Sequence, residues 1–424
     1  MPIMNRLTPL IVLLSAGCAA NPPAIRLSEA QARNSAAAAA SKPAVDPSQS
    51  TPVEALTPRQ AMARELQNPL PRARVESPEA FFRGEVLAAG TPEVNKRPNG
   101  VVILTLPIGT ATPITCFFHP EAIDAGATAK VLIESLLEDV KLERVRATDV
   151  KAFANSPALF LEADFVQDDK VGRLKMVVHA DPVLPKTCFH DEMGYVQTFQ
   201  RVTESLATGL SSTAEEQPVP PYFSDVQVMR VNDVVLGFQY AALFHAKSGG
   251  TVLETNTTMV RPGTPATLQY QDTSIQEWVD DKGVLQSKSY HKRLGQEITA
   301  QVRAERQEDG SYGVEGSMGG KDVKARLSGE LLGEVGIALR VRDGLLKGGA
   351  KLETAMWIPP SDASAPTRVV VSPRAGAGPR SATMEMNQMS VNVEFDVHGF
   401  TERMEAPAGG ASFVTERISQ TGTP

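Results

Sequence analysis

The second half of the chain is dominated by alternation of apolar and polar positions. The clearest case lies at residues 391–397, where Val391, Val393, Phe395 and Val397 alternate with polar side chains. A period of two residues is typical of a strand that buries one face and exposes the other. The segment therefore predicts an antiparallel strand with one dry and one wet face.

Similar alternation at residues 236–244 and 298–304 extends this prediction over most of the region from 224 to 418. Turn signals separate the runs, with Asp281-Lys282-Gly283 after the first and Asp309-Gly310 after the second. A long antiparallel meander twists and should curl. Apolar residues at helical spacing in 328–339 predict one helix, which would cover the open mouth of the curl.

The first half of the chain mixes strand and helix patterns. Strands are predicted at four segments, namely 81–87, 101–106, 158–166 and 173–179. A helix is predicted over 129–140, and a second helix follows where Tyr195, Phe199, Val202 and Leu206 recur at spacings of four, three and four residues. A turn-like stretch at 167–170 joins the last two strands.

A chain of 424 residues is too long for one domain of typical size, and the proline break at 218–221 suggests where it divides. The predicted fold class is α+β. A small α/β sandwich-like domain at 78–212 precedes a mostly antiparallel β half-barrel-like domain at 222–418.

Residues 19–77 are rich in Ala, Pro, Ser and Gln and contain no aromatic residue. Such a composition buries too little apolar surface to offset the entropy lost on ordering. The segment predicts a disordered tether between the N-terminus and the folded domains.

The N-terminus has the layout of an export signal. One positive side chain within Met1–Arg6 precedes a short, mostly apolar region, Leu7–Leu14, and Ser15-Ala16-Gly17-Cys18 follows. This resembles the lipobox of bacterial lipoproteins, in which small residues admit a signal peptidase and the cysteine thiol takes a diacylglyceryl group. Residues 1–18 would then be the signal peptide and lipobox, with Cys18 as the lipidated new N-terminus.

Ser15 departs from the lipobox pattern, in which a leucine is most common at that place, and an ordinary signal peptide cleaved near Ala20 remains the alternative. By the same resemblance, the absence of aspartate after the cysteine favours the outer membrane. The expected location is the periplasmic face of that membrane, with the protein anchored by lipid.

Charge and hydropathy narrow the function classes. The formal net charge is −7, and no basic stripe interleaved with aromatics occurs, which argues against a nucleic-acid binder. No apolar stretch after residue 20 approaches the roughly 20 residues of a spanning helix. Membrane contact is therefore expected through the lipid alone.

Two cysteines, Cys116 and Cys188, remain once Cys18 is assigned to lipid. Exported proteins meet an oxidising compartment, so the two are predicted to form a disulfide. His119 and His190 would complete a tetrahedral zinc set with them, but the Cys-x-His spacing is tighter than usual for such sites. A Cys-His nucleophile is disfavoured because the paired cysteine would quench it.

Other motifs yield no chemistry. Met384, Met386 and Met389, with His398 downstream, could ligate Cu(I), but methionines beside an alternating strand more often pack or line a cavity. The run 316–319 lacks the first glycine of a nucleophile elbow and is interpreted as a turn. No acid/base pair, no resident metal and no cofactor is predicted.

Two weaker resemblances concern the domains. The stretch with Gly194, Tyr195, Thr198 and Phe199 before a closing helix resembles the PsbP and DcrB group of small α/β modules. The β-rich half, over residues 224–418, resembles in layout the LolA and LolB half-barrels of lipoprotein sorting, which implies a concave face that holds acyl chains.

The predicted function is that of a non-enzymatic envelope lipoprotein. Its β-domain is expected to bind an apolar ligand, such as a lipid or acyl chain, or a partner of the envelope, and the membrane contact is the N-terminal lipid. The alternatives are a structural or assembly lipoprotein without a small ligand and, less favoured, an uncharacterised periplasmic enzyme. A ligand-binding domain would contain a cavity, whereas an assembly protein would show a filled interior and an apolar surface patch.

Overall fold

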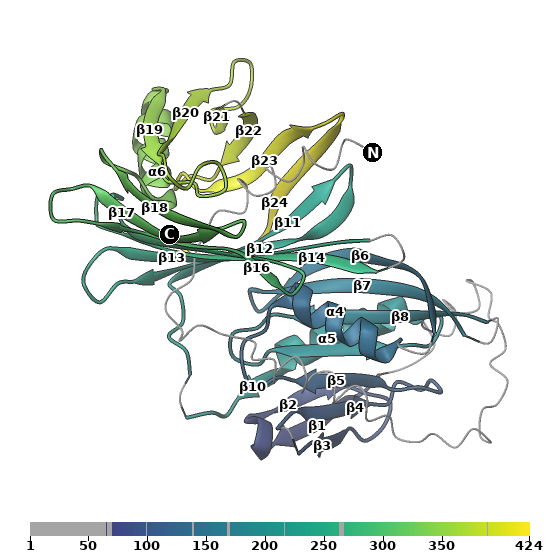
Figure 1. The fold of residues 1–424 in the computed structure, drawn as a ribbon. Coiled ribbons are helices and arrows are strands. Elements are labelled where there is room, and N and C mark those ends of the chain that lie inside the picture. Colours follow the sequence, from purple (N-terminus) through teal and green to yellow (C-terminus); the bar gives the residue numbers. More distant parts are fainter. Residues whose placement is uncertain are drawn as a thin grey trace. The chain divides into compact units, whose positions relative to one another are not determined.

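The structure is a computed structural model that describes residues 65, 70–98, 100–137, 140–167, 170–215, 217–262, 267–387 and 389–424. It divides into two compact units, shown in Figure 1. The C-terminal unit comprises residues 220–259 and 270–424, and the N-terminal unit comprises the described residues up to 219 with those of 260–269. Each unit is described by itself.

The N-terminal unit consists mainly of antiparallel strands. Within its described residues, seven strands form one sheet in the order β3-β4-β5-β9-β8-β7-β6. Their bounds are β3 (Glu93–Lys96), β4 (Val102–Leu106), β5 (Ile114–Phe118), β6 (Lys141–Phe153), β7 (Ser156–Gln167), β8 (Lys170–His179) and β9 (Lys186–His190). A second sheet orders β1 (Arg72–Ser77), β2 (Phe82–Leu87) and β10 (Leu210–Ser212), and a 3₁₀ turn, η2 (Pro78–Ala80), links β1 to β2.

Two helices complete this unit, α4 (Ala125–Leu136) and α5 (Val196–Gly209). The predicted stripe of α5 is buried at Phe199, Val202 and Leu206. In contrast, α4 begins four residues before the predicted start at 129. Its first turn buries small residues, Ala125 to Ala129, so the pattern of large apolar side chains does not mark its beginning.

Six strands of this unit were not predicted, namely β1, β3, β5, β6, β9 and β10, and two of them show why. Strand β1 lies within the segment 19–77 assigned to the tether, and it contributes one core residue, Val75, which is 3% exposed. A single apolar residue is too weak a pattern to signal a strand. Strand β6 carries many charged residues, and its pairing with β7 shifts register twice, which disrupts the period of two.

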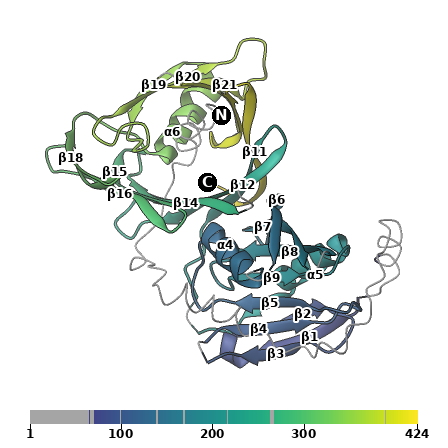
Figure 2. The same cartoon turned by 45° about the vertical axis from the view of Figure 1, so that its right-hand side comes forward.

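The C-terminal unit contains one antiparallel sheet that curls on itself (Figure 2). Among the described residues the sheet has fourteen strands in the order β18-β17-β16-β15-β14-β13-β12-β11-β24-β23-β22-β21-β20-β19, and the ends of β13 and β14 extend into the segment 260–269. The strands are β11 (Phe223–Val231), β12 (Val234–His245), β13 (Thr251–Pro262), β14 (Leu268–Val279), β15 (Leu285–Leu294), β16 (Glu297–Arg306), β17 (Tyr312–Met318), β18 (Lys321–Leu327), β19 (Leu352–Met356), β20 (Thr367–Pro373), β21 (Ser381–Met386), β22 (Met389–Phe395), β23 (Thr401–Ala408) and β24 (Ala411–Gly422).

Helix α6 (Glu334–Arg340) lies inside this curl and continues as a π-helical segment, η3 (Val341–Leu346) (Figure 2). The prediction placed the helix start at 328 and the helix over an open mouth. Residues before 334 are not helical, because Leu331 and Leu332 form backbone hydrogen bonds with Leu285 and Ala355 of neighbouring strands.

Two apolar clusters surround α6. The Trp357 cluster comprises Phe223, Leu243, Leu253, Ile275, Val279, Leu285, Tyr290, Ala300, Val302, Ala304, Tyr312, Val314, Leu327, Leu331, Val335 and Trp357. The Phe395 cluster comprises Met229, Met259, Val284, Leu332, Ile337, Val341, Leu345, Met356, Ile358, Val369, Val371, Ala382, Met386, Val391, Val393, Phe395, Ala406 and Phe413. The face of the sheet that carries these clusters is called the concave face below.

The backbone of α6 touches the turn between β14 and β15. A Cβ on Gly336 would lie 2.1 Å from the carbonyl oxygen of Gly283, and Gly283 itself has φ +77°. Both positions therefore require glycine, and their contact fixes the depth of α6 in the curl.

The predicted alternation is followed within strands and ends at their boundaries. Val391, Val393 and Phe395 are buried, but Val397 is 66% exposed because β22 ends at Phe395 and the chain turns. Ile298 is likewise exposed, next to a register shift between β15 and β16. Among the described residues, no helix has the length and apolar character needed to cross a membrane.

Candidate functional site

A row of polar side chains crosses the concave face between the two apolar clusters. On β11, Phe223 belongs to the Trp357 cluster and Met229 to the Phe395 cluster, and Asp225 and Gln227 lie between them on the same face. Strand β13 has the same order, with Thr255 and Thr257 between the two clusters. We call this set the polar band: Asp225, Gln227, Gln239, Thr255, Thr257, Gln271, Thr273, Tyr290, Thr415 and Arg417.

Strand register brings the members of the polar band side by side. Gln227 is opposite Gln239 on β12 and opposite Arg417 on β24, and Gln239 is in turn opposite Thr257 on β13. Neighbouring strands lie about 4.8 Å apart, so these side chains form a continuous polar surface.

Six atoms of the polar band are buried and have no hydrogen-bond partner among the described residues. They are Oδ1 of Asp225, Oε1 of Gln239, Nε2 of Gln271 and the hydroxyl oxygens of Thr255, Thr257 and Thr415. Burial raises the pKa of Tyr290, and an interaction with the Thr273 hydroxyl opposes that rise, so the phenol stays neutral.

The free-energy cost of burying polar atoms without hydrogen bonds indicates that the polar band has a partner. Each buried polar atom without a partner costs about 1–3 kcal/mol. Six of them would cost an amount similar to the whole stability of a domain, about 5–15 kcal/mol. The polar band therefore needs water or a polar ligand against it.

One end of the polar band holds a buried ion trio. The Nε of Arg417 donates to Oδ2 of Asp225 at 2.9 Å, and Nη1 donates to Oδ2 of Asp396 at 2.8 Å. Asp225 is 3% exposed. Burial raises its pKa to about 6, although the guanidinium of Arg417 opposes the rise.

A second ion trio lies where α6 begins. Nζ of Lys288 is 2.9 Å from Oε2 of Glu277 and 3.6 Å from Oε1 of Glu334. Burial raises the pKa of Glu334 to about 7; Lys288 opposes this rise, and the carboxylates of Glu277 and Asp225 add to it. Each trio thus has two carboxyl groups for one cationic group.

The first trio also borders a surface cleft of about 400 Å³. The cleft is lined by Arg380, Asp396, Val397, His398, Glu402 and Arg417, with residues of β24. Val397 and Ile418 expose 66% and 38% of their surface there. Because Asp396 and Arg417 line the cleft and Arg417 contacts Asp225, the trio lies between the cleft and the polar band.

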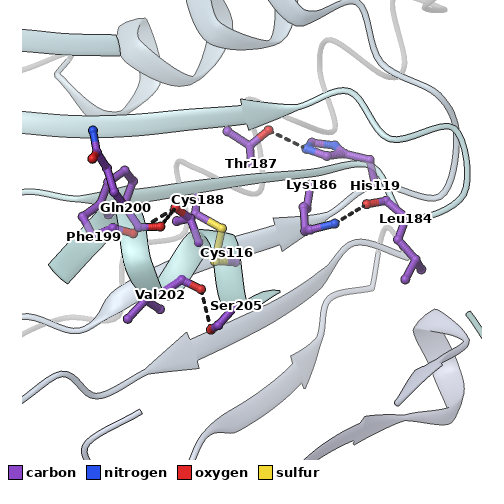
Figure 3. The surroundings of a disulfide bond; sticks show 11 residues. Cys116, His119, Leu184, Lys186, Thr187, Cys188, Phe199, Gln200, Val202 and Ser205 are labelled. Carbon is purple, nitrogen blue, oxygen red and sulfur yellow. Dashed lines mark hydrogen bonds between the residues drawn. A yellow bond between two sulfur atoms is a disulfide. The ribbon is translucent and has the colours of Figure 1, made fainter. Parts of the chain in front are cut away.

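The predicted cysteine pair lies in the N-terminal unit. Cys116 and Cys188 form a disulfide, and they are directly opposite each other on the neighbouring strands β5 and β9 (Figure 3). Each cysteine lies in the middle of its strand. Both are buried in a cluster that includes Phe199 and Val202 of α5.

The two histidines of the alternative zinc set are not arranged around these sulfurs. Nε2 of His119 lies 3.1 Å from the hydroxyl of Thr187 (Figure 3), and His190 is fully buried. Burial lowers the pKa of each to about 4, so both imidazoles are neutral. Within the described ranges, no three His, Cys, Asp or Glu side chains are placed to hold a metal ion.

The methionines considered as copper ligands pack in the core. Met386 is a member of the Phe395 cluster, and Met384 and Met389 pack against it. Ser317 of the Gly-Ser-Met-Gly run lies in β17, just before the turn to β18. Cys18 and the predicted tether up to residue 64 lie outside the described residues.

Comparison with known proteins adds little. No family model and no curated protein matches the chain. Similar solved structures include a β-barrel-like protein of the domain of unknown function DUF1849 from Brucella abortus, at 12% identity and TM-score 0.37, covering 48% of this chain and 98% of that one. A DUF1089 family protein from Pseudomonas aeruginosa has 10% identity and TM-score 0.24, covering 40% and 89%. TM-scores this low support no conclusion.

The polar band was missed by the sequence analysis. Its signal is a run of polar residues in the middle of a strand, such as 254–258 in β13 and 271–274 in β14. Such a run favours a loop when it is considered alone, because neither face of the strand is apolar there.

Proposed function

We propose that this protein is a non-enzymatic envelope lipoprotein whose C-terminal unit binds an amphiphilic, lipid-like ligand on its concave face. The lipid on Cys18 would hold it at the periplasmic face of the outer membrane. In this proposal the curled sheet corresponds to the half-barrel-like domain expected from the sequence. The N-terminal unit corresponds to the expected α/β sandwich-like domain.

The proposal is supported by the polar band. A purely structural domain has no reason to bury six polar atoms without partners, because apolar side chains of the same shape would be more stable. A ligand that supplies hydrogen bonds would remove the cost, which makes the band a binding surface.

The surroundings of the polar band indicate an amphiphile. Met229 and Met259 border it on one side, and their flexible thioethers can adapt to an alkyl chain. The Trp357 cluster borders the other side. A ligand with a polar centre and apolar parts would match this order, which modifies the purely apolar ligand expected from the sequence.

Native mass spectrometry tests the ligand. Residues 19–424, exported behind a cleavable signal peptide that leaves no lipid, should carry an excess mass of lipid size under gentle conditions and lose it on denaturation. Replacing Thr255 and Thr257 by valine should reduce occupancy about tenfold, since two hydrogen bonds are lost.

The matched control is Thr383→Val, which removes a hydroxyl from the opposite face of the same sheet, next to the inward Ala382. It should leave occupancy unchanged. A bare mass for the unsubstituted protein would contradict the proposal and favour the assembly role, and equal loss in both valine variants would contradict the role of the band.

The lipid anchor is tested on the full chain in a Gram-negative host. The unsubstituted protein should incorporate labelled fatty acid and sediment with membranes, whereas Cys18→Ala should do neither, because its side chain offers no thiol to acylate. The double variant Cys116→Ala/Cys188→Ala is the control and should retain the label. Label that persists in Cys18→Ala, or a mature chain that begins after Ala20, would rule out the lipobox.

A further inference from the structure

The ion trio at the end of the polar band has an uncompensated negative charge. Asp225 and Asp396 together carry two carboxylates, and Arg417 supplies one positive charge. The first trio is therefore short of positive charge, and the carboxylate of Asp225 also raises the pKa of Glu334 in the second trio.

Arg417 has little capacity left for an anionic ligand. Besides its two carboxylate partners, Arg417 donates from Nη1 to Oε1 of Gln420 at 2.9 Å and from Nη2 to the carbonyl oxygen of Thr401 at 3.1 Å. Four of its five N–H groups are thus used. A ligand with a net negative charge would therefore be repelled by the two carboxylates and would find few donors on Arg417.

One acceptor of the trio has no partner among the described residues. Oδ1 of Asp225 is buried and unpartnered, whereas Oδ2 accepts hydrogen bonds from Arg417 and Gln227. A carboxylate oxygen only accepts hydrogen bonds, so this atom calls for a donor.

We propose that the ligand of the concave face carries an ammonium group, which binds Oδ1 of Asp225 beside the ion trio. An ammonium has three N–H donors and a full positive charge, so it supplies both the hydrogen bond and the charge that the trio lacks. This inference rests on the proposed lipid-binding function and names the head group. A phosphatidylethanolamine lipid and a small free amine share this chemistry.

A competition between two lipids tests the proposal. Residues 19–424 are incubated with vesicles that contain equal amounts of phosphatidylethanolamine and phosphatidylglycerol with isotope-labelled chains, and native mass spectrometry identifies the captured lipid. Phosphatidylethanolamine should be enriched about tenfold or more, which is the effect of one hydrogen bond to a charged group. Asp225→Asn should abolish the enrichment.

Glu394→Gln serves as the charge control, because it removes one negative charge from an exposed position of β22. It should keep the enrichment. Loss of the preference in Glu394→Gln, or its survival in Asp225→Asn, would overturn the proposal.

The remaining outcomes separate this inference from the function on which it rests. Equal capture of both lipids would overturn the ammonium site and leave lipid binding intact, whereas capture of neither would overturn the proposed function itself. A parallel arm adds excess free ethanolamine. If ethanolamine is bound in place of lipid, the ammonium site stands and the ligand is a small amine. If lipid capture is unchanged, the ligand is the intact phosphatidylethanolamine lipid.

Discussion

Replacing both Cys116 and Cys188 by alanine is expected to lower the free energy of unfolding of the N-terminal unit by about 4 kcal/mol. The disulfide joins residues 72 positions apart. Removing it therefore increases the conformational entropy of the unfolded chain, which stabilises the unfolded state. Part of the loss comes from the core, since both sulfurs are buried within an apolar cluster beside α5. This effect is a large fraction of the stability of a typical domain.

Hydrogen exchange measured by mass spectrometry reports this loss locally. Peptides that cover β5 and β9 should exchange faster in the double variant, and the unsubstituted protein should match the variant after its disulfide is reduced. Residues 19–424 contain no other cysteine, so the reduced protein is a clean reference. Protection of β5 and β9 that changes by less than about 1 kcal/mol would show that the bond contributes little.

Asp225→Asn is expected to stabilise the C-terminal unit increasingly as the pH rises. The pKa of Asp225 is raised from 3.8 to about 6 in the folded state, mainly by burial, with Arg417 opposing and Asp396 adding to the rise. The folded state therefore binds this proton more tightly than the unfolded state does. The resulting stabilisation is complete below the unfolded pKa and is lost as the pH rises through about 6.

The difference in unfolding free energy between Asp225→Asn and the unsubstituted protein should grow by about 3 kcal/mol from acidic to slightly alkaline pH. Urea unfolding followed by tryptophan fluorescence measures it, because both tryptophans, Trp278 and Trp357, belong to the C-terminal unit. Glu394→Gln should show no such trend. A difference that stays constant with pH would mean that Asp225 is ionised as readily in the folded protein as in the unfolded one.

Local patterns in the sequence determined many of the elements of this protein. The stripe of Phe199, Val202 and Leu206 predicted α5, and the alternation of Val391, Val393 and Phe395 predicted β22, because these patterns follow the geometry of a single helix or strand. The pairing of Cys116 with Cys188 was also predictable, since the chain offers no other partner once Cys18 is assigned. Export and lipidation of Cys18 remain predictions from the sequence.

Tertiary contacts decided what the local patterns could not. Strand β1 exists because β2 provides a partner for it, although Arg72–Ser77 contains almost no apolar signal. Residues before Glu334 leave the helix because neighbouring strands bind their backbone. In both cases hydrogen bonds to distant segments outweigh local preference.

The candidate site depends on tertiary structure most of all. Asp225, Gln239, Thr257 and Arg417 lie on four strands that are spread over almost 200 residues, and only the register of the sheet aligns them. The sequence determined which residues are polar, whereas the register and curl of the sheet determined that they are buried together. Burial is what turns ordinary surface side chains into costly unpartnered groups, and it depends on packing between segments that no local pattern encodes.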